Sequence, residues 1–383
     1  MDLTWSAAEE AFRAEAREWL TANVPDTPLP SGDTREGFAA HLDWERRLFD
    51  ARWAVVSWPE RYGGRDASVW EWLIFEEEYY RAGAPQRVTQ NGIFLLAPTL
   101  FEFGTQEQQD TLLPRMAAAQ DLWCQGWSEP GAGSDLASLT SRASPVEGGW
   151  RLSGQKTWTT RGAFCTHLFG LFRSDPESVR HRGLTYFLVP LDADGVTVRG
   201  FGRLDGDEGF AEVFFDDVFV PESAALGGVG KGWSVAMATT GSERGLTLRS
   251  PGRFLESARR LRDLAAEVAA AHPGRLTGRL REDVIEASMR AEAYQLFTLS
   301  QVSDMVKGRP TGAESSLNKL WWSELDVLTH RTALALRGAD AGVDEPWSRG
   351  FQFSLAGPIY AGTNEIQRNV VAERVLGLPR VGR

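Results

Sequence analysis

The change in hydrophobic pattern along the chain constrains its fold more than any other feature. Apolar residues recur at helical spacing up to about residue 120, and this spacing returns after about residue 226. Between these regions the chain carries short runs rich in β-branched and aromatic residues, each bounded by Gly, Asp or Pro. A run of strands between two helical regions predicts an α+β protein. We expect an N-terminal helical domain over residues 1–120, a central antiparallel β-domain over 121–226 and a C-terminal four-helix bundle over 227–383.

The same patterns predict individual elements. We expect a helix over residues 4–20 with Thr4 as its N-cap, and a second helix over 68–83 that ends at Gly83. The stretch 338–347 is expected to be a loop. Strands are expected over 149–160, 166–175, 183–191, 195–201 and 210–220. Two facing helices are expected from apolar residues three or four positions apart: Leu280, Val284, Ala287, Ala291 and Tyr294 in one, and Leu317, Trp321, Leu325, Leu328 and Thr332 in the other.

The charge of the chain argues against one class of partner. Its 383 residues carry a formal net charge of −11. A nucleic-acid partner needs a basic field to collect its phosphates, so we expect none. An acidic protein still binds an anionic cofactor locally, through helix N-termini and a few basic side chains.

Cysteine, histidine and the N-terminus set further expectations. Cys124 and Cys165 have no C-x-x-C spacing, and the five histidines follow no metal-binding pattern, so we expect neither a disulfide framework nor a metal site. The N-terminal stretch is charged and amphipathic and has no apolar signal region. No apolar run approaches the roughly 20 residues that span a bilayer. We therefore expect a cytoplasmic protein without a membrane span.

The stretch "IYAGTNEIQRN", residues 359–369, predicts a turn that opens a helix. Thr363 is a good N-cap, and Glu365 lies in the first turn, where a negative charge suits the helix dipole. Apolar residues then recur at helical spacing until Gly377 and Pro379 end the helix. A Gly-Thr turn at a helix N-terminus presents backbone N–H groups that suit a phosphate. The alternative is an ordinary capped surface helix.

Two stretches of the β-region contain residues that suit a planar ligand. "WSEPGAGSDLASL", residues 127–139, places Ser128 beside a Gly-rich turn, where a ligand approaches the backbone closely. "SGQKTWTT", residues 153–160, places Trp158 and Thr160 on one side of a strand, because side chains alternate. The alternatives are an ordinary loop for the first stretch and an edge strand with a half-buried Trp for the second.

Taken in order, these motifs resemble the acyl-CoA dehydrogenase family over essentially the whole chain. Helices are followed by "CQGWSEPGAGSD", "SGQKTWTT" and "EVFFDDVFVPESAALGGVGKGW", and a second helical region closes with "IYAGTNEIQRNVVAERVLGLPR". The resemblance implies an oxidoreductase with the three-domain fold of that family and a bound FAD. It also implies an acyl-CoA substrate, an electron-transfer flavoprotein as acceptor, and assembly into a homo- or hetero-oligomer with a related subunit.

The resemblance also implies roles for individual residues. Ser128 and Thr160 would contact the flavin ring, and Trp158 would pack against it. Thr363 would meet the flavin phosphates, and Ser134 would lie near the CoA arm. The full set that the resemblance implies is Gln125, Trp127, Ser128, Trp158, Thr160, Gly362, Thr363 and Glu365 for the cofactor, and Ser134 and Arg244 for the substrate.

The catalytic base is expected at an unusual position. The chemistry needs a group that takes the α-proton, and a glutamate in a closed apolar site suits this role because burial raises its pKa. The best-known family members carry that glutamate just before the Gly-Thr turn, where this chain has Ala361. A second lineage carries it on the first helix after the β-domain, followed by Arg. Glu243 and Arg244 match that pattern, so Glu243 is the expected base; the alternative is a solvated helix residue.

Two family segments that complete the FAD site are missing. The Gln-x-x-Gly-Gly-x-Gly segment is replaced by residues 335–351, and no Arg-x-x-Phe-Gly run is present. Both losses resemble bacterial acyl-CoA dehydrogenases that act on bulky CoA thioesters, including steroid side chains, and that often pair two unlike subunits. Two alternatives remain: a non-catalytic subunit that completes FAD sites in a heteromer, and a flavin monooxygenase or oxidase on the same fold, which would consume oxygen rapidly.

Overall fold

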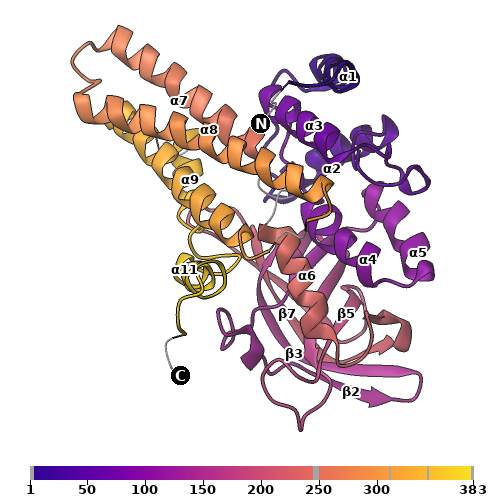
Figure 1. The fold of residues 1–383 in the computed structure, drawn as a ribbon. Coiled ribbons are helices and arrows are strands. Elements are labelled where there is room, and N and C mark those ends of the chain that lie inside the picture. Colours follow the sequence, from indigo (N-terminus) through magenta and orange to yellow (C-terminus); the bar gives the residue numbers. More distant parts are fainter. Residues whose placement is uncertain (1–3, 245–249, 310–311, 343–344, 381–383) are drawn as a thin grey trace. The chain divides into compact units, whose positions relative to one another are not determined.

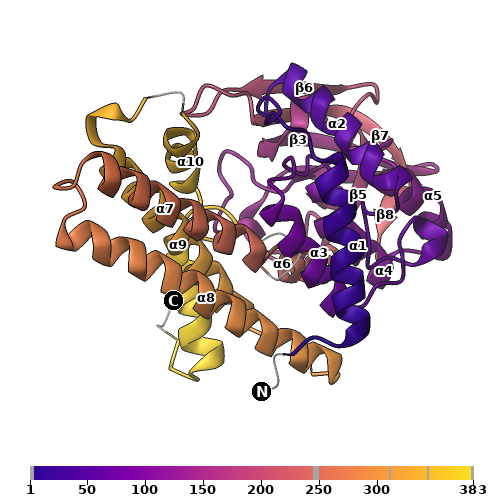
Figure 2. The same ribbon diagram turned by 90° about the horizontal axis from the view of Figure 1, so that it is seen from above.

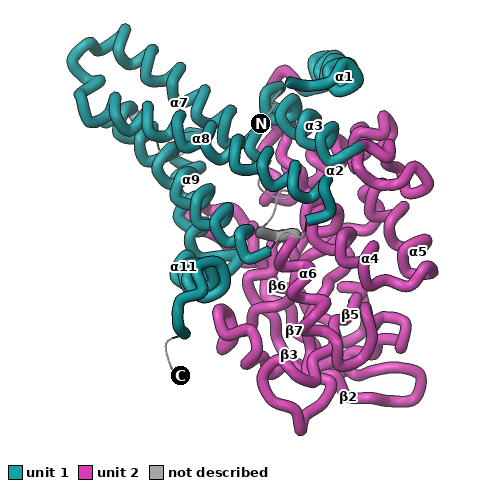
Figure 3. The backbone as a smooth tube through the Cα atoms, in the orientation of Figure 1, with its two compact units in different colours: residues 1–24, 68–84, 244–383 teal, residues 25–67, 85–243 magenta. Residues whose placement is uncertain are grey.

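The structure is a computed structural model that describes residues 4–244, 250–309, 312–342 and 345–380. The chain divides into two compact units, each built from separate stretches of sequence (Figure 3). Unit 1 comprises residues 1–24, 68–84 and 244–383, and unit 2 comprises residues 25–67 and 85–243. The three domains expected from the sequence stay a prediction.

Unit 2 is built on a mixed eight-stranded sheet (Figure 1). The strand order is β6-β7-β3-β2-β4-β5-β8, with β1 pairing β4 beside this path. Neighbouring strands are antiparallel except for β1 with β4 and a single pair of residues between β2 and β4. The strands are β1 Trp123–Gly126, β2 Arg142–Val146, β3 Gly149–Thr160, β4 His167–Arg173, β5 Leu184–Pro190, β6 Val196–Phe201, β7 Phe210–Pro221 and β8 Ala225–Leu226.

The five predicted strands are confirmed as β3 to β7, each within two residues of its expected bounds. Alternating side chains of these strands fill one core, in which Leu152, Val213 and Phe215 are buried together with Phe172 and Phe187. β3 pairs with β7 on one side and β2 on the other. β3 is therefore an interior strand over residues 149–153; from Gly154 to Thr160 the described ladder pairs it with β7, so the edge-strand alternative for 153–160 is excluded only at Ser153.

Two of the helices of unit 2 begin at well-defined side-chain N-caps. Thr34 caps α2 by accepting from the Gly37 N–H, and Thr105 caps α5 in a reciprocal capping box with Gln108. The helices of unit 2 are α2 Arg35–Asp50, α4 Ala97–Phe103, α5 Gln106–Ala117 and α6 Gly232–Arg244, with a π-helical stretch over Asn91–Leu96 and short 3₁₀ turns over Glu60–Tyr62, Leu136–Ser138, Gly162–Phe164 and Glu222–Ala224.

Unit 1 is helical, and α7, α8 and α9 lie side by side in it (Figures 1 and 2). Their contact faces form one core that includes Phe254, Tyr294, Trp322 and Leu325. Its helices are α1 Ala7–Asn23, α3 Val69–Arg81, α7 Pro251–Ala271, α8 Gly278–Val306, α9 Ser315–Arg337, α10 Pro346–Ser354 and α11 Asn364–Val370, with a 3₁₀ turn over Gly338–Asp340 and a π-helical turn over Val371–Val375.

Three sequence predictions in unit 1 need correction. Ser6, rather than Thr4, caps α1, because Ser6 forms the capping box with Glu9. Leu325, Leu328 and Thr332 of the predicted α9 stripe are buried, but Trp321 is 42% exposed and its neighbour Trp322 is fully buried in its place. The predicted loop 338–347 contains a 3₁₀ turn and runs into α10. The predicted face of α8 is confirmed, with its apolar residues buried or partly buried in the core.

The described residues show neither a membrane-spanning helix nor a metal-binding cluster. Among the described helices, none is long and apolar enough to cross a membrane. Within the same described ranges, no group of three His, Cys, Asp or Glu side chains is placed to hold a metal ion.

Candidate functional site

The motif loop that follows β1 is held by the buried carboxylate of Glu129. One oxygen of this carboxylate accepts from the Thr140 N–H at 2.7 Å and the Thr140 hydroxyl at 2.9 Å. The other accepts from the Ser141 N–H at 2.9 Å and from Nζ of Lys156 at 2.8 Å. The Ser128 carbonyl accepts from the Thr157 N–H at 2.9 Å. Ser128 is half-buried and is thereby fixed beside the end of β3.

Lys156 and Glu129 form an ion pair inside unit 2. Lys156 is fully buried, and Glu129 is 7% exposed. Burial lowers the pKa of Lys156 to about 8, against the opposing attraction of Glu129. Burial also acts to raise the pKa of Glu129, but the attraction of Lys156 and the hydrogen bonds to the carboxylate outweigh it and lower that pKa to about 2. Glu129 is therefore ionised in the folded protein at neutral pH.

The end of β3 exposes a large aromatic side chain. Trp158 is 61% exposed, although most tryptophans of folded proteins are largely buried. Its φ of 58° lies in the left-handed region, and a bulge puts one extra residue on β3 between Lys156 and Thr159. Phe201 and Phe210 meet the Trp158 ring edge-on, with centroids 5.3 and 5.6 Å away. These two ring contacts position the indole, and Thr160, two residues further along, is half-buried.

Two side chains near the motif loop, those of the partly buried Gln125 and the buried Trp127, each carry a donor nitrogen that is shielded from solvent. In the part of the chain that the structure describes, neither Nε2 of Gln125 nor Nε1 of Trp127 reaches a hydrogen-bond acceptor. Buried donors are nearly always paired, so such atoms call for an acceptor that the chain does not supply. A planar heteroaromatic ring with acceptor atoms fits these donors and the exposed indole of Trp158. The residues of unit 2 therefore fit the flavin ring that the sequence predicts.

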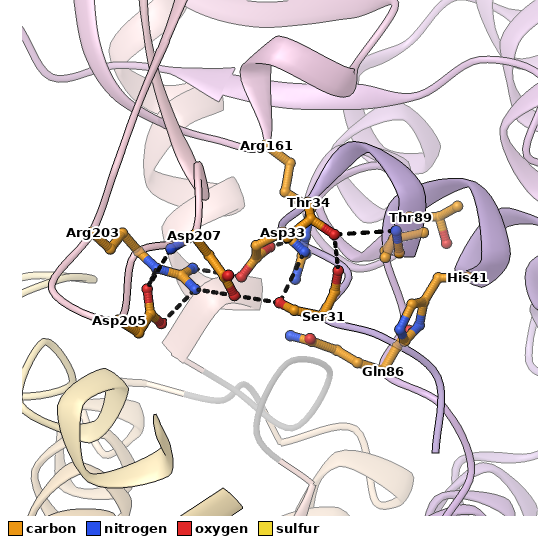
Figure 4. Close-up of polar contacts among 12 residues, drawn as sticks. Ser31, Asp33, Thr34, His41, Gln86, Thr89, Arg161, Arg203, Asp205 and Asp207 are labelled. Carbon is orange, nitrogen blue, oxygen red and sulfur yellow. Dashed lines mark hydrogen bonds and ion pairs between the residues drawn. The ribbon is translucent and has the colours of Figure 1, made fainter. Parts of the chain in front are cut away.

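A buried ion network follows directly after Thr160. Asp33 lies between Arg161 and Arg203 (Figure 4), with one oxygen 2.6 Å from Nε of Arg161 and the other 2.5 Å from Nη1 of Arg203. Arg203 also binds Asp205 at 2.7 Å. Burial acts to raise the pKa of Asp33, but attraction to Arg161 and Arg203 lowers it. The network joins the loop before α2 to the ends of β3 and β6.

The C-terminal turn of unit 1 has the predicted cap. The Thr363 hydroxyl accepts from the Ile366 N–H at 3.3 Å, and Ala361 and Gly362 both have positive φ, 56° and 80°. The side-chain amide of Gln367 donates to the Ala361 carbonyl at 2.8 Å and fixes this turn. Glu365 is exposed, and hydrogen bonds from its own backbone N–H and from the Thr363 side chain lower the pKa of its carboxylate. The carboxylate of Glu365 therefore accepts hydrogen bonds from groups at the start of this helix.

Gln125, Trp127, Ser128, Trp158 and Thr160 all lie in unit 2, around the ends of β1 and β3. Ser134 is exposed on the motif loop. Gly362, Thr363 and Glu365 lie in unit 1. The backbone of Glu243 and Arg244 is the last turn of α6, and their side chains lie outside the described residues. The assigned roles of these residues stay predictions.

The sequence interpretation missed Glu129, Lys156, Asp33 and Arg161. One signal was present in the sequence. Lys156 follows the buried Leu152 by four residues in a strand, and because side chains alternate between the two faces, Lys156 points to the same face as Leu152, toward the core. A lysine at such a position requires a buried carboxylate partner. The identity of that partner does not follow from spacing, since Glu129 is 27 residues away and Asp33 is 128 residues from Arg161.

Comparison with known proteins identifies the family. Models of the acyl-CoA dehydrogenase N-terminal, middle and C-terminal domains match residues 6–120, 124–218 and 230–376. The acyl-CoA dehydrogenase IpdE1 of Mycobacterium tuberculosis is 39% identical over 97% of this chain and 98% of its own length. The bovine mitochondrial short-chain specific acyl-CoA dehydrogenase is 29% identical over 83% of this chain and 78% of its own.

Solved structures agree with this assignment. The Tcur3481-Tcur3483 steroid ACAD has a TM-score of 0.87 at 26% identity, with all of both chains covered. The ChsE4-ChsE5 complex from Mycobacterium tuberculosis has a TM-score of 0.83 at 26% identity, also with full coverage of both chains. With its helical, β-sheet and helical regions in the same order, this chain belongs to the acyl-CoA dehydrogenase family, a family of oxidoreductases.

Proposed function

We propose that the protein is an FAD-dependent acyl-CoA dehydrogenase that introduces an α,β double bond into a bulky acyl-CoA thioester. The observation that carries the proposal is the two buried donors of Gln125 and Trp127, which find no acceptor among the described residues and lie near the exposed Trp158. FAD is the cofactor named for two solved neighbours of this fold, both complexes of PigA. The steroid-acting neighbour supports a bulky, steroid-like acyl group, and Ser134 is proposed to lie along the CoA arm, with Arg244 on the substrate side.

Binding and orientation are the proposed tasks of most site residues. The Trp158 indole would pack against the flavin ring, and the hydroxyls of Ser128 and Thr160 would hydrogen-bond to it. Gly362 and Thr363 meet the phosphates of the cofactor through the turn before α11. When bound, FAD supplies the acceptor for the hydride that leaves the substrate β-carbon.

Glu243 is the proposed base and takes the proton from the substrate α-carbon. One α C–H bond and one β C–H bond break, and the α,β double bond forms between these carbons. The proton would go to the Glu243 carboxylate, and bound FAD would supply the acceptor for the hydride and its electron pair. Ala361 stands where better-known members of the family carry their glutamate, so that position supplies no base in this chain.

The proposed partners follow from the relatives. Two solved neighbours are named as pairs of unlike chains, which supports a related but different subunit as partner. An electron-transfer flavoprotein is the proposed acceptor of the electrons. The second candidate function, a non-catalytic subunit of such a heteromer, is favoured by the missing segments that complete an FAD site in other members.

Anaerobic titration tests the proposal. The protein, purified alone or with its partner and loaded with FAD, is mixed with CoA thioesters of straight-chain, branched and steroid-derived acids. We expect the visible absorption band of the flavin to bleach with at least one bulky thioester and the product to carry an α,β double bond. A preparation that stays colourless after added FAD contradicts the proposal, and rapid oxygen consumption by the reduced protein favours an oxidase or oxygenase.

A further inference from the structure

We propose that two buried ion pairs, Lys156–Glu129 and Arg161–Asp33, hold the segment 157–160 between them in the one conformation that presents Trp158 and Thr160 to the flavin ring. The four partners are positioning residues and none is assigned contact with the cofactor or substrate. The inference rests on the proposed function for its ligand. We refer to residues 157–160 as the bracketed segment.

The bracketed segment has a backbone that its sequence does not favour. Trp158 has φ 58° and Arg161, just after the segment, has φ 54°. Residues with side chains rarely adopt this region, and a bulky aromatic residue there is an outlier. Such conformations persist where the surroundings over-determine them, and they cluster at ligand sites. Something outside the segment must therefore hold it.

The first pair fixes the start of the bracketed segment. Nζ of fully buried Lys156 lies 2.8 Å from Oε1 of Glu129. Glu129 is itself held by three further hydrogen bonds from Thr140 and Ser141. The next backbone N–H, that of Thr157, donates to the Ser128 carbonyl at 2.9 Å. The pair therefore ties the segment to the motif loop that carries Ser128.

The second pair fixes the other end. The Arg161 side chain is 4% exposed, with Nε 2.6 Å from Asp33. Its backbone N–H donates to the Gly209 carbonyl at 2.9 Å. Asp33 also binds Arg203, two residues after Phe201 (Figure 4). Arg161 and its partners therefore position both the segment and the strand ends that bring Phe201 and Phe210 against Trp158.

The burial of the two ion pairs restricts motion of the bracketed segment. A buried cation that leaves its carboxylate loses an attraction that water does not replace, so each pair opposes rotation of the backbone next to it. The exposed Trp158 indole has no comparable burial of its own to fix it. Pre-organising this ring before the ligand arrives reduces the ordering cost of binding.

The test uses the full-length chain and two variants. Arg161→Asn removes the second pair; Asn tolerates a left-handed backbone, and Asp33 keeps Arg203, so no buried charge is left alone. Glu129→Gln removes the first pair. Glu45→Gln is the matched control: it breaks the Glu45–Arg87 pair in the same unit, which is 2.8 Å long and equally buried but does not flank the segment.

Two measurements separate positioning from general stability. Amide hydrogen exchange of the 156–161 peptide in the FAD-free protein should speed up by about tenfold or more in Arg161→Asn and Glu129→Gln, and not in the control. The dissociation constant for FAD should rise by about tenfold in the same two variants, the lower end of the range found when groups that position metal ligands are removed. Arg161→Lys restores a cation for Asp33 and should recover part of both effects.

The outcomes are distinguishable. If both variants match the control in exchange and in FAD affinity at equal loss of thermal stability, the two pairs are only structural and the inference is overturned. If the parental chain binds no FAD, the proposed function fails. In that case exchange in the FAD-free protein still decides whether the pairs hold the bracketed segment.

Discussion

At the scale of single residues, the pKa of Glu129 predicts how the stability of the protein depends on pH in the acid range. Its pKa of about 2 is below its ordinary 4.5, so the folded state releases this proton more readily than the unfolded state. The ionised carboxylate therefore contributes stability above about pH 4.5, and the contribution is lost as the pH falls toward 2. The shift corresponds to about 3 kcal/mol of unfolding free energy. Urea unfolding of the parental chain and of Glu129→Gln at pH 6 and at pH 3 measures it.

We expect the parental chain to lose more stability than Glu129→Gln between these two pH values. Other paired carboxylates, such as Asp33, titrate in both proteins and cancel in the comparison. Equal losses in the two proteins would show that the Glu129 carboxylate is not selectively stabilised by folding.

Glu243 carries the prediction that decides the chemistry. Glu243→Gln keeps the volume and much of the polarity of the side chain but removes the basic oxygen, so folding and FAD content should be retained. Anaerobic bleaching of the flavin by a good acyl thioester should slow by roughly 10²-fold to 10⁴-fold, the usual range for loss of a general base. Substrate affinity should change far less, because the base acts mainly in the transition state. Stopped-flow absorbance measures both quantities.

A companion variant checks the location of the base. Ala361→Glu in the Glu243→Gln background restores a carboxylate at the position used by better-known family members. Some recovery of bleaching would indicate that the two positions face one α-carbon. Bleaching at the parental rate in Glu243→Gln alone would make the base assignment wrong, and the non-catalytic subunit would become the better hypothesis.

At the scale of elements, the start of α11 makes a prediction about the cofactor. Thr363→Ala removes the cap that accepts from the Ile366 N–H, and loss of such a cap costs about 1 kcal/mol of helix stability. If the turn also meets the FAD phosphates, FAD affinity should fall by about tenfold or more, since hydrogen bonds to charged groups contribute about 1.5–3 kcal/mol. Titration of FAD-free protein measures this, and Thr363→Ser should bind FAD almost as the parental chain does. Loss of thermal stability with unchanged FAD affinity would leave Thr363 as an ordinary helix cap.

The elements also explain what sequence patterns predict well. β3 to β7 were predicted closely because alternation and flanking Gly, Asp and Pro both mark strands, and the two signals agree. The α9 stripe was predicted correctly at Leu325, Leu328 and Thr332, but Trp321 was chosen in place of Trp322 because the two are equally apolar in sequence. Only contacts with α7 and Tyr360 decide that Trp322 is the buried one.

The candidate site was predictable in part. Motif residues such as Ser128 and Trp158 could be proposed as site residues because the order of the motifs along the chain is specific to a family. The ion pairs that hold them were not found, because Glu129 and Asp33 meet their partners through folding of distant segments. The left-handed backbone conformation of Trp158 could not be predicted from the sequence, since Trp is among the residues least expected to adopt a positive φ.

At the scale of the whole molecule, unit 1 exposes more apolar surface than an isolated chain needs. On α8, Ile285 is 51% exposed and Met289 is 65% exposed. In the C-terminal segment, Ile359, Leu376 and Leu378 are 66%, 65% and 52% exposed. Exposed apolar side chains concentrated on a few elements mark protein interfaces. We therefore expect the chain to function as part of an oligomer.

Cofactor stoichiometry distinguishes the two kinds of oligomer. The segments that reach a neighbouring subunit's FAD in other members are absent from this sequence, so we expect two identical chains to complete each other's FAD sites poorly. We expect less than one FAD per chain when the protein is expressed alone, and a higher ratio when it is co-expressed with a related chain that carries those segments. Absorbance gives FAD per chain, and light scattering gives the mass of the assembly. A homo-oligomer that holds one FAD in every chain would rule out the unlike partner, and the FAD site would then have to be completed by residues outside the two family segments.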